Sequence, residues 1–148
     1  MNTEKIVNDN QKPTPHEILV AITIDDRSYK IAAGRHAVAD VEKLAGIPAS
    51  RKLATGAGPK YQPLEGTVDI VGGERFVSVV QITIAGKHYW VRPGTHTVVE
   101  LKNIGGVLLA HELDEKVNGK LVPLQDNASV EISGHEMFIS HPRDAQSS

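Results

Sequence analysis

The chain carries the stretch Ile22-Thr23-Ile24 … Tyr29-Lys30-Ile31 … Gly34-Arg35-His36-Ala37-Val38, and the same pattern returns as Ile82-Thr83-Ile84 … Tyr89-Trp90-Val91 … Gly94-Thr95-His96-Thr97-Val98. The offset from Ile22 to Ile82 is 60 residues, and it holds without a gap as far as Leu64 and Leu124. Two further residues then enter the second copy. Because matches in fixed register over a whole unit indicate an internal repeat, each copy is predicted to form one structural unit.

Each copy is expected to open with a β-hairpin. The first run, residues 18–24, is apolar, and Asp25-Asp26-Arg27 separates it from the alternating segment Tyr29-Lys30-Ile31. The second copy has Ala85-Gly86-Lys87 at the turn, where glycine tolerates a positive φ. Alternation on both sides of a short turn is typical of paired antiparallel strands.

A short helix is predicted next in each copy. Thr97 stands three residues before Glu100, which is the spacing of a capping box. Ala37 replaces the capping threonine in the first copy, so we expect its helix to start less firmly, by about 1 kcal/mol. The apolar stripes at spacing three are Val98, Leu101 and Ile104 in the second copy and Val38, Val41 and Leu44 in the first. The expected helix stops are Gly105-Gly106 and Gly46.

Short strands are expected to complete each unit. Asn118-Gly119 between two strand-like runs predicts a two-residue hairpin, whereas residues 56–59 predict a looser turn. The last strand of each unit is predicted at residues 68–70 and 130–132. One helix must bury its apolar stripe against one sheet face, which predicts an α+β roll of the β-grasp kind.

The expected domain organisation follows from the repeat. Two domains are predicted at residues 18–78 and 79–142, with a flexible amino-terminal tail at 1–17 and a carboxyl-terminal tail at 143–148. A domain of this size buries only about 60% of its unfolded surface, so each is expected to be marginally stable alone. The segment that connects the two predicted domains contains no Gly/Ser-rich linker. The two domains are therefore expected to lie close together with restricted relative motion.

Composition excludes several classes of function. The 148 residues include no cysteine, which excludes disulfides, a thiol nucleophile and a cysteine zinc site. The net charge is −2, which argues against a nucleic acid or an anionic membrane as partner. The first residues lead into no apolar run and no stretch approaches about 20 apolar residues, so a cytoplasmic protein is expected.

The repeated unit resembles ubiquitin-like β-grasp domains. The resemblance rests on a hairpin followed by Thr97-Val98, Glu100-Leu101-Lys102 in the second copy, and on Gly46-Ile47-Pro48 in the first. The tandem arrangement is similar to the bacterial multi-ubiquitin family, and it extends from Ile18 to Ser140. The closing Gly-x-Glu-x-Phe-x-Ser pattern is Gly72, Glu74, Phe76 and Ser78 in one copy and Gly134, Glu136, Phe138 and Ser140 in the other.

This resemblance implies a protein modifier without enzymatic activity. Such a modifier is processed at its carboxyl terminus and conjugated to target proteins by an adenylating activating enzyme and a conjugating enzyme. A JAB-type metalloprotease accompanies these systems, which are associated with anti-phage defence. The alternative is a tandem β-grasp scaffold or binding module that is never conjugated.

The carboxyl-terminal end departs from the family pattern because it has no terminal diglycine. A peptidase trims it, a different terminal residue is used, or this chain is not conjugated. The candidate processing and conjugation segment is Ser140, His141, Pro142 and Arg143. Gly72-Gly73 is predicted to be a turn, because its counterpart is Gly134-His135 and glycine mainly serves positive φ. Lys87, Lys102 and Lys120 are potential acceptors for chain growth or ordinary surface lysines.

No catalytic, cofactor-binding or metal-ligating residue is predicted. His36 and His96 are repeat equivalents, which favours a structural role, and the histidines show no zinc-ligand spacing. Glu74 and Glu136 recur beside turns, with no carboxylate paired to them for acid–base work. Trp90 replaces Lys30 of the first copy, so it is the candidate for a partner contact, with packing on an edge strand as the alternative.

Overall fold

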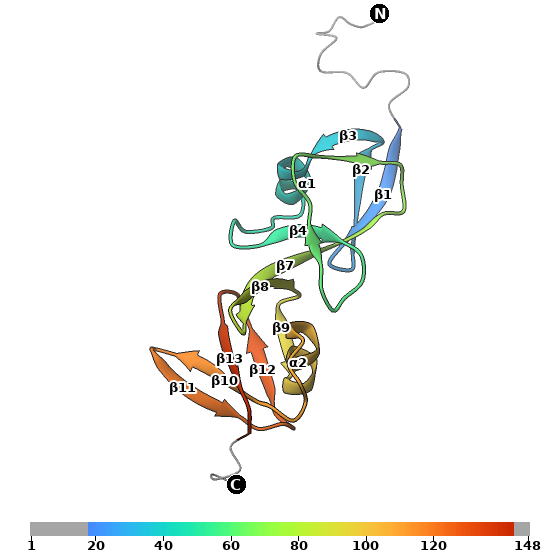
Figure 1. Ribbon diagram of the computed structural model, residues 1–148. Helices are drawn as coiled ribbons and strands as arrows, with labels where there is room; N and C mark the ends of the chain where they lie inside the picture. The colour runs from blue at the N-terminus through green and yellow to red at the C-terminus, as the bar shows by residue number, and fades with distance from the viewer. Residues whose placement is uncertain (1–17, 144–148) are drawn as a thin grey trace, which may run out of the picture.

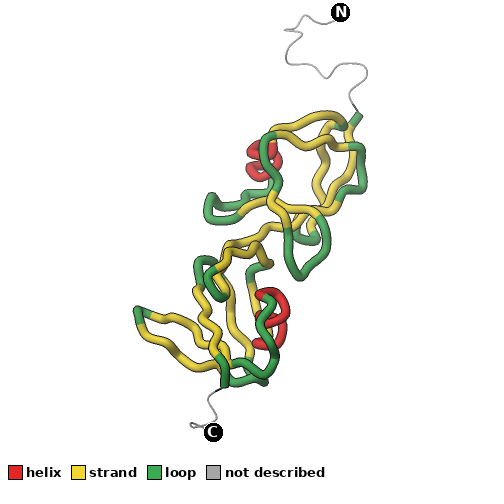
Figure 2. The backbone as a smooth tube through the Cα atoms, in the orientation of Figure 1, coloured by secondary structure: helices red, strands yellow, loops and turns green. Residues whose placement is uncertain are grey.

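A computed structural model describes residues 18–143, which form an α+β fold rich in β-sheet with two short helices in that range (Figures 1 and 2). The amino-terminal half contains β1 (Leu19–Ile24), β2 (Arg27–Ala32), β3 (Gly34–Ala37), α1 (Val38–Leu44), β4 (Lys52–Thr55), β5 (Gln62–Pro63) and β6 (Thr67–Ile70). The strand β7 (Arg75–Ile84) follows. The remaining elements are β8 (Lys87–Val91), β9 (Gly94–Thr97), α2 (Val98–Gly105), β10 (Glu112–Val117), β11 (Lys120–Leu124), β12 (Ser129–Ile132) and β13 (Met137–His141).

The predicted hairpins are confirmed. β1 pairs with β2, β7 with β8 and β10 with β11, each in antiparallel register. Asp25 and Asp26 both have positive φ, at 51° and 68°, and Asn118 and Gly119 have 53° and 80°. Two consecutive positive φ values define the type I′ turn, whose twist matches that of the flanking strands.

β7 is the element around which the other strands are arranged. Its first half pairs with β4 and runs parallel to β1, and its second half pairs with β8 and runs parallel to β13. The main sheet has the order β11-β10-β13-β7-β1-β2. Figure 1 shows β7 passing from one group of strands to the other. The boundary predicted between residues 78 and 79 falls inside this strand.

Two clusters of buried apolar side chains lie along β7. One consists of Ile22, Ile24, Val38, Val41, Leu53, Ile70 and Phe76. The other consists of Val80, Ile82, Ile84, Val91, Val98, Leu101, Ile104, Leu113, Val130, Ile132 and Phe138. Burying a phenylalanine side chain in such a cluster stabilises the fold by about 1.5–3 kcal/mol. Each cluster contains the apolar face of one helix.

The helix caps follow the sequence prediction. The Glu100 amide donates to Thr97 Oγ1 at 3.0 Å and the Thr97 amide donates to Glu100 Oε1 at 3.2 Å, which completes the capping box of α2. Gly106 ends α2 with a φ of 67°, a left-handed conformation that glycine adopts without steric cost. Ala37 provides no side-chain cap for α1.

The prediction that Leu44 lies in the buried stripe of α1 is wrong. Its side chain is 44% exposed, and Ala45 packs against the cluster instead. An α-helix turns by about 100° per residue, so a residue four positions after Val41 lies nearer to that side chain's direction than one three positions after it. The spacing of three therefore selected the neighbouring residue.

The strands predicted at residues 68–70 and 130–132 are present as β6 and β12, but the prediction that they are the last strands of their copies is wrong. β6 and β12 are not part of the main sheet but pair with β3 and β9 in two-stranded sheets. The last strand of each copy is β7 or β13, which contains the Phe76 or Phe138 of the closing pattern. No strand was predicted at residues 34–37 and 94–97, where the structure has β3 and β9. This long-range pairing leaves little trace in the local sequence pattern.

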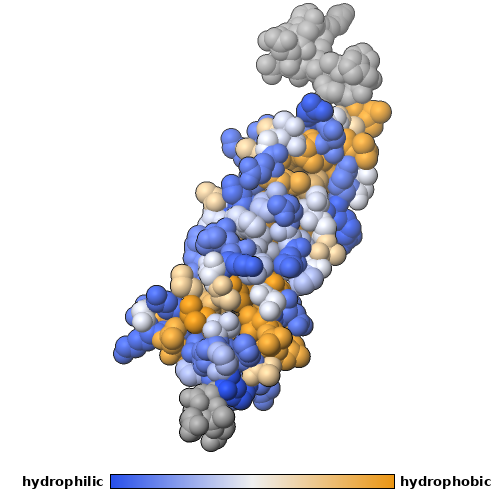
Figure 3. Space-filling view, in the orientation of Figure 1, coloured by the Kyte–Doolittle hydropathy of each residue, from blue (hydrophilic) through white to orange (hydrophobic). Residues whose placement is uncertain are grey.

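Several apolar side chains are exposed on the surface of the described region (Figure 3). The most exposed are Ile18, Leu19, Val71, Leu108, Leu109 and Leu121.

Within residues 18–143, no helix has the length and apolar character needed to cross a membrane.

Candidate functional site at the carboxyl-terminal strand

The candidate processing segment begins inside the main sheet. β13 lies between β10 and β7, and its residues Ser140 and His141 pair with Leu113 and Glu112 of β10. Residues that exchange ladder contacts with a neighbouring strand are held in a fixed extended conformation. The sheet therefore holds this part of the segment in place as far as His141.

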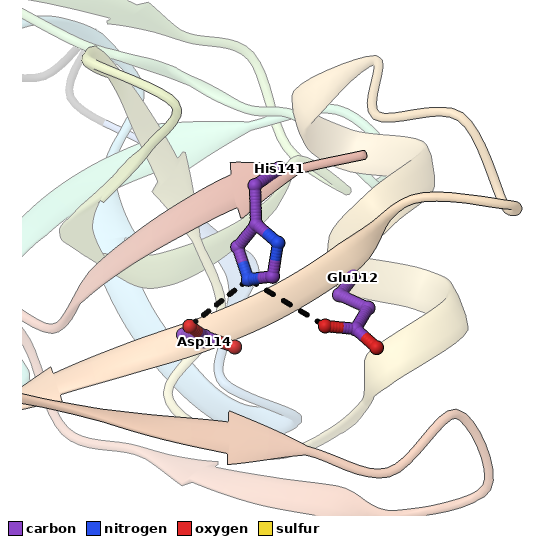
Figure 4. A group of neighbouring side chains, drawn as sticks. All are labelled: Glu112, Asp114 and His141. Atoms are coloured by element: carbon purple, nitrogen blue, oxygen red, sulfur yellow. Dashed lines mark hydrogen bonds and ion pairs between the residues drawn. The ribbon is translucent and has the colours of Figure 1, made fainter. Parts of the chain in front are cut away.

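Three polar side chains meet where β13 ends. Glu112 and Asp114 are two residues apart on β10 and therefore point to the same face of the sheet. His141 stands directly opposite Glu112 in the strand register. Its Nε2 atom lies 3.1 Å from Asp114 Oδ2 and 3.6 Å from Glu112 Oε1. Figure 4 draws both contacts as dashed lines. The cluster thus brings two carboxylates to one imidazole nitrogen.

Burial makes the three groups unequal. The Asp114 side chain is only 9% exposed, whereas His141 is 40% and Glu112 is 35% exposed. Asp114 Oδ1 is buried and has no hydrogen-bond partner among the described residues. The hydrogen bond with the Pro142 carbonyl, followed by that with Asp114, raises the pKa of His141 above its ordinary value. The three groups are also close enough to act as ligands to one cation.

Arg143 ties the end of the described chain to the sheet. Its Nη1 lies 3.3 Å from Glu112 Oε2 and its Nη2 lies 3.1 Å from Asp126 Oδ2. Its Nε donates to the carbonyl of Ala110 at 3.4 Å. The Arg143 side chain is partly exposed, so each ion pair contributes less than about 1 kcal/mol. Together they orient the segment that follows β13.

A buried lysine contacts Asp126, the same carboxylate that pairs with Arg143. Lys102 on α2 is 1% exposed, and its ammonium donates to Asp126 Oδ1 at 3.1 Å and to the carbonyl of Leu109 at 3.1 Å. The hydrogen bond and charge of Lys102, with a further contribution from Arg143, lower the pKa of Asp126. Lys102 is therefore not a surface lysine, and the expectation that it accepts chain growth is wrong.

The repeated glutamates accept hydrogen bonds from the backbone of the turns beside them. Glu136 Oε2 accepts from the Ser133 amide at 2.8 Å, and Oε1 accepts from the Gly134 amide at 2.8 Å. Glu74 accepts from two backbone amides in the same way, that of Gly72 among them. Gly72 and Gly73 have positive φ, at 116° and 85°, and lie in a turn, which confirms that interpretation of the diglycine.

The repeated histidines also have the predicted structural role. His36 Nε2 lies 2.6 Å from the Ala32 carbonyl oxygen, and His96 Nε2 lies 2.6 Å from that of Arg92. In each case the ring nitrogen donates to the carbonyl four residues earlier. His36 thereby links β3 to the last residue of β2, and His96 links β9 to the residue that follows β8.

Trp90 lies on β8 opposite Gln81 and is half-buried. Its carbonyl accepts a hydrogen bond from the Tyr61 amide at 3.1 Å. The neighbouring Tyr89 packs against the cluster that contains Phe138, and the Lys60 ammonium lies 5.8 Å from the Tyr89 ring centre. The loop between β4 and β5 thus contacts β8. A partner contact at Trp90 remains a prediction.

Glu112 and Asp114 were missed in the sequence. Two acidic residues at a spacing of two are common on exposed strands, so the pattern alone indicates no site. His141 is 27 residues from Asp114, and only the pairing of β10 with β13 brings them together. A search for zinc-ligand spacing within one element cannot find such a cluster.

No protein-family model matches the chain, and no curated protein matches its sequence. The family resemblance therefore rests on the residues of this chain alone.

Proposed function

We propose that the chain is a ubiquitin-like protein modifier made of two tandem β-grasp domains, residues 18–78 and 79–142. The observation that carries this proposal is the pair of hydrophobic clusters. Each cluster is formed by side chains of a hairpin, one helix and a closing strand. The closing strand runs parallel to the first strand of the hairpin. One helix packed on one face of a small mixed sheet is the arrangement expected of a β-grasp.

The proposed modifier acts as a substrate and not as an enzyme. It is processed at its carboxyl terminus, and the new terminus is joined to target proteins in the cytoplasm. Its partners are an adenylating activating enzyme, a conjugating enzyme and a JAB-type metalloprotease, in anti-phage defence. The resemblance to the bacterial multi-ubiquitin family supports this part of the proposal.

The environment of the processing segment bears on where cleavage occurs. A cut after Ser140 removes His141 and Arg143, and with them the ion pairs to Glu112, Asp114 and Asp126. A cut after Arg143 leaves all of these interactions intact. We therefore propose a processing site at or beyond Arg143, which disfavours cuts after Ser140, His141 and Pro142.

The test is intact mass spectrometry of an amino-terminally tagged chain recovered from its native host, with a blot for larger species. A shortened chain together with a ladder of higher-mass adducts is expected, and the mass identifies the new terminus. A single full-length species, recovered while an activating and a conjugating enzyme are expressed, contradicts conjugation.

The second candidate function is a scaffold or binding module that is never conjugated. The observation that favours the scaffold is the attachment of residues 140–143 to β10. Strand pairing holds Ser140 and His141, and an ion pair with Glu112 holds Arg143. A terminus that an activating enzyme adenylates must instead reach into that enzyme's active site. The unmodified full-length species in the experiment above supports the scaffold.

A further inference from the structure

We propose that Glu112, Asp114 and His141 form a binding site for a divalent transition metal ion of the zinc class. This inference is independent of the proposed modifier function. It also revises the sequence-based expectation that the chain has no metal ligand. The three side chains come from two adjacent strands, β10 and β13, and they point toward one another (Figure 4).

The distances from His141 Nε2 to the two carboxylates fit a tetrahedral ion. Zinc binds imidazole nitrogen and carboxylate oxygen at about 2.0–2.2 Å, so two ligand atoms of one tetrahedron lie about 3.4 Å apart. His141 Nε2 lies 3.1 Å from Asp114 Oδ2 and 3.6 Å from Glu112 Oε1, on either side of that value. All three ligand atoms lie within 4.8 Å of one another, so the two carboxylate oxygens need to approach by at most about 1.4 Å to share one ion.

The orientation of the His141 ring is that of a metal ligand. Its Nδ1 lies 3.3 Å from the Pro142 carbonyl oxygen, to which only a protonated nitrogen can donate. A ligating histidine commonly donates its other ring nitrogen to such a carbonyl. In the neutral ring, Nε2 then carries a lone pair that faces two carboxylates. A cation must lie between them, either a proton on Nε2 or a metal ion.

The burial of Asp114 favours the metal ion over the proton. More than nine-tenths of its side chain is buried, and its Oδ1 has no hydrogen-bond partner among residues 18–143. A buried carboxylate oxygen left unpaired is costly. A proton on His141 serves Oδ2 only. A divalent ion bound by Oδ2 places two positive charges beside Asp114 and Glu112, whereas the protonated ring places one.

The neighbouring arginine leaves the metal position open. Arg143 contacts Glu112 through Oε2, whereas Oε1 is the atom that faces His141. Among residues 18–143, Asp114 forms its ion pair with His141 and not with Arg143. The remaining coordination position falls to water.

The ligand set selects the kind of metal. One imidazole and two carboxylates suit zinc and its neighbours in the first transition row, whereas magnesium and calcium take oxygen ligands. Because the ligands come from β10 and β13, the bound ion links the carboxyl-terminal strand to its neighbour. Binding is therefore expected to raise the thermal unfolding midpoint of the whole chain.

The test is calorimetric titration of the untagged, chelator-treated full chain with Zn²⁺, together with the same titration with Mg²⁺. One Zn²⁺ ion is expected to bind per chain. Asp114→Asn and His141→Gln are each expected to weaken Zn²⁺ binding at least about tenfold. Loss of a group that only hydrogen-bonds to a metal ligand already lowers metal affinity about 10- to 100-fold. The matched control is His88→Gln, an exposed histidine on β8, which is expected to bind as the unsubstituted chain does.

A second measurement needs no substitution and therefore does not depend on folding of the variants. Zn²⁺ is expected to shift the imidazole nuclear magnetic resonances of His141 and leave those of His88 in place. The proposal is overturned if Zn²⁺ does not saturate the chain below about 1 mM, an affinity of only about 4 kcal/mol. It is equally overturned if the Asp114 and His141 variants bind normally, or if Mg²⁺ binds as tightly as Zn²⁺.

Discussion

Glu136 illustrates how a single side chain determines a turn. Burial alone would raise the pKa of its carboxyl group, but the amides of Ser133 and Gly134 outweigh burial and lower it from its ordinary value near 4.5. A carboxyl group whose pKa is lower in the folded than in the unfolded chain stabilises the fold above its unfolded pKa. That stability is lost as the pH falls through the folded pKa.

We expect Glu136→Gln to destabilise the chain by about 1 kcal/mol at pH 7, which is less than a buried charged hydrogen bond contributes because solvent screens the site. The difference from the unsubstituted chain is expected to shrink as the pH falls below about 4.5. Urea unfolding of both chains at pH 7 and at a pH below about 4.5 measures this difference in stability. Glu65→Gln, at an exposed glutamate, is the control. An equal deficit at both pH values would contradict the assigned role.

Trp90 is the residue at which the partner prediction can be examined directly. Trp90→Ala is expected to reduce the conjugate ladder at least about tenfold, as large losses are typical of aromatic anchors in interfaces. The thermal midpoint of the purified variant separates lost contact from lost packing. A normal ladder from the variant would eliminate the contact and leave packing beside Gln81 as the role of the indole.

At the scale of the elements, α2 is fitted closely against the hairpin strand. A Cβ atom placed on Gly105 would overlap the Cγ2 of Ile84. The equivalent residue of the first copy is Ala45, which packs on its cluster without needing a glycine. We expect Gly105→Ala to destabilise the chain by about 1–3 kcal/mol through overpacking.

Thermal and urea unfolding of Gly105→Ala measure this cost. Ala45→Gly serves as the matched control, because it removes a methyl group at the corresponding position and creates no overlap. An unchanged midpoint for Gly105→Ala would mean that α2 shifts freely over the sheet, against the close packing described here.

The strand β13 makes a second element-scale prediction. A chain ending at Ser140 is expected to be about 1–2 kcal/mol less stable than a chain ending at Arg143, because it loses two ion pairs of Arg143 and the His141 contacts. Comparing their urea midpoints tests this. If both chains are equally stable, the structural argument against cleavage after Ser140 fails.

The elements also differ in how well the sequence predicts them. The turn at Asn118-Gly119 and the cap at Thr97 depend on neighbouring residues, and both were predicted correctly. Leu44 was not, because a spacing of three and a spacing of four both fit a seven-residue helix. The β3–β6 pairing and the meeting of His141 with Asp114 depend on strand register across long separations, which local pattern does not contain.

At the scale of the whole molecule, β7 couples the two hydrophobic clusters. Phe76 is buried in one and Val80 in the other, with no break in the strand between them. The ion pair of Arg92 with Asp25, at 3.4 Å, and the hydrogen bond from Tyr61 to Trp90 cross between the same two parts. A continuous strand resists bending more than a flexible linker does.

We therefore expect solution scattering to fit one orientation of the two proposed domains. Inserting Gly-Ser-Gly-Ser between Ser78 and Val79 is expected to broaden the distribution, since it interrupts β7 at the proposed boundary. A broad distribution in the unsubstituted chain would contradict the restricted motion predicted from the sequence.

The central claim is that this chain becomes covalently joined to other proteins through its carboxyl terminus. The most direct measurement is tandem mass spectrometry of a protease digest of the high-mass species captured from the native host. We expect branched peptides in which an amino group of a target protein is bonded to the terminal carboxyl of this chain, at or beyond Arg143. High-mass species without such branched peptides, or no high-mass species while an activating and a conjugating enzyme are expressed, would contradict conjugation and favour the scaffold.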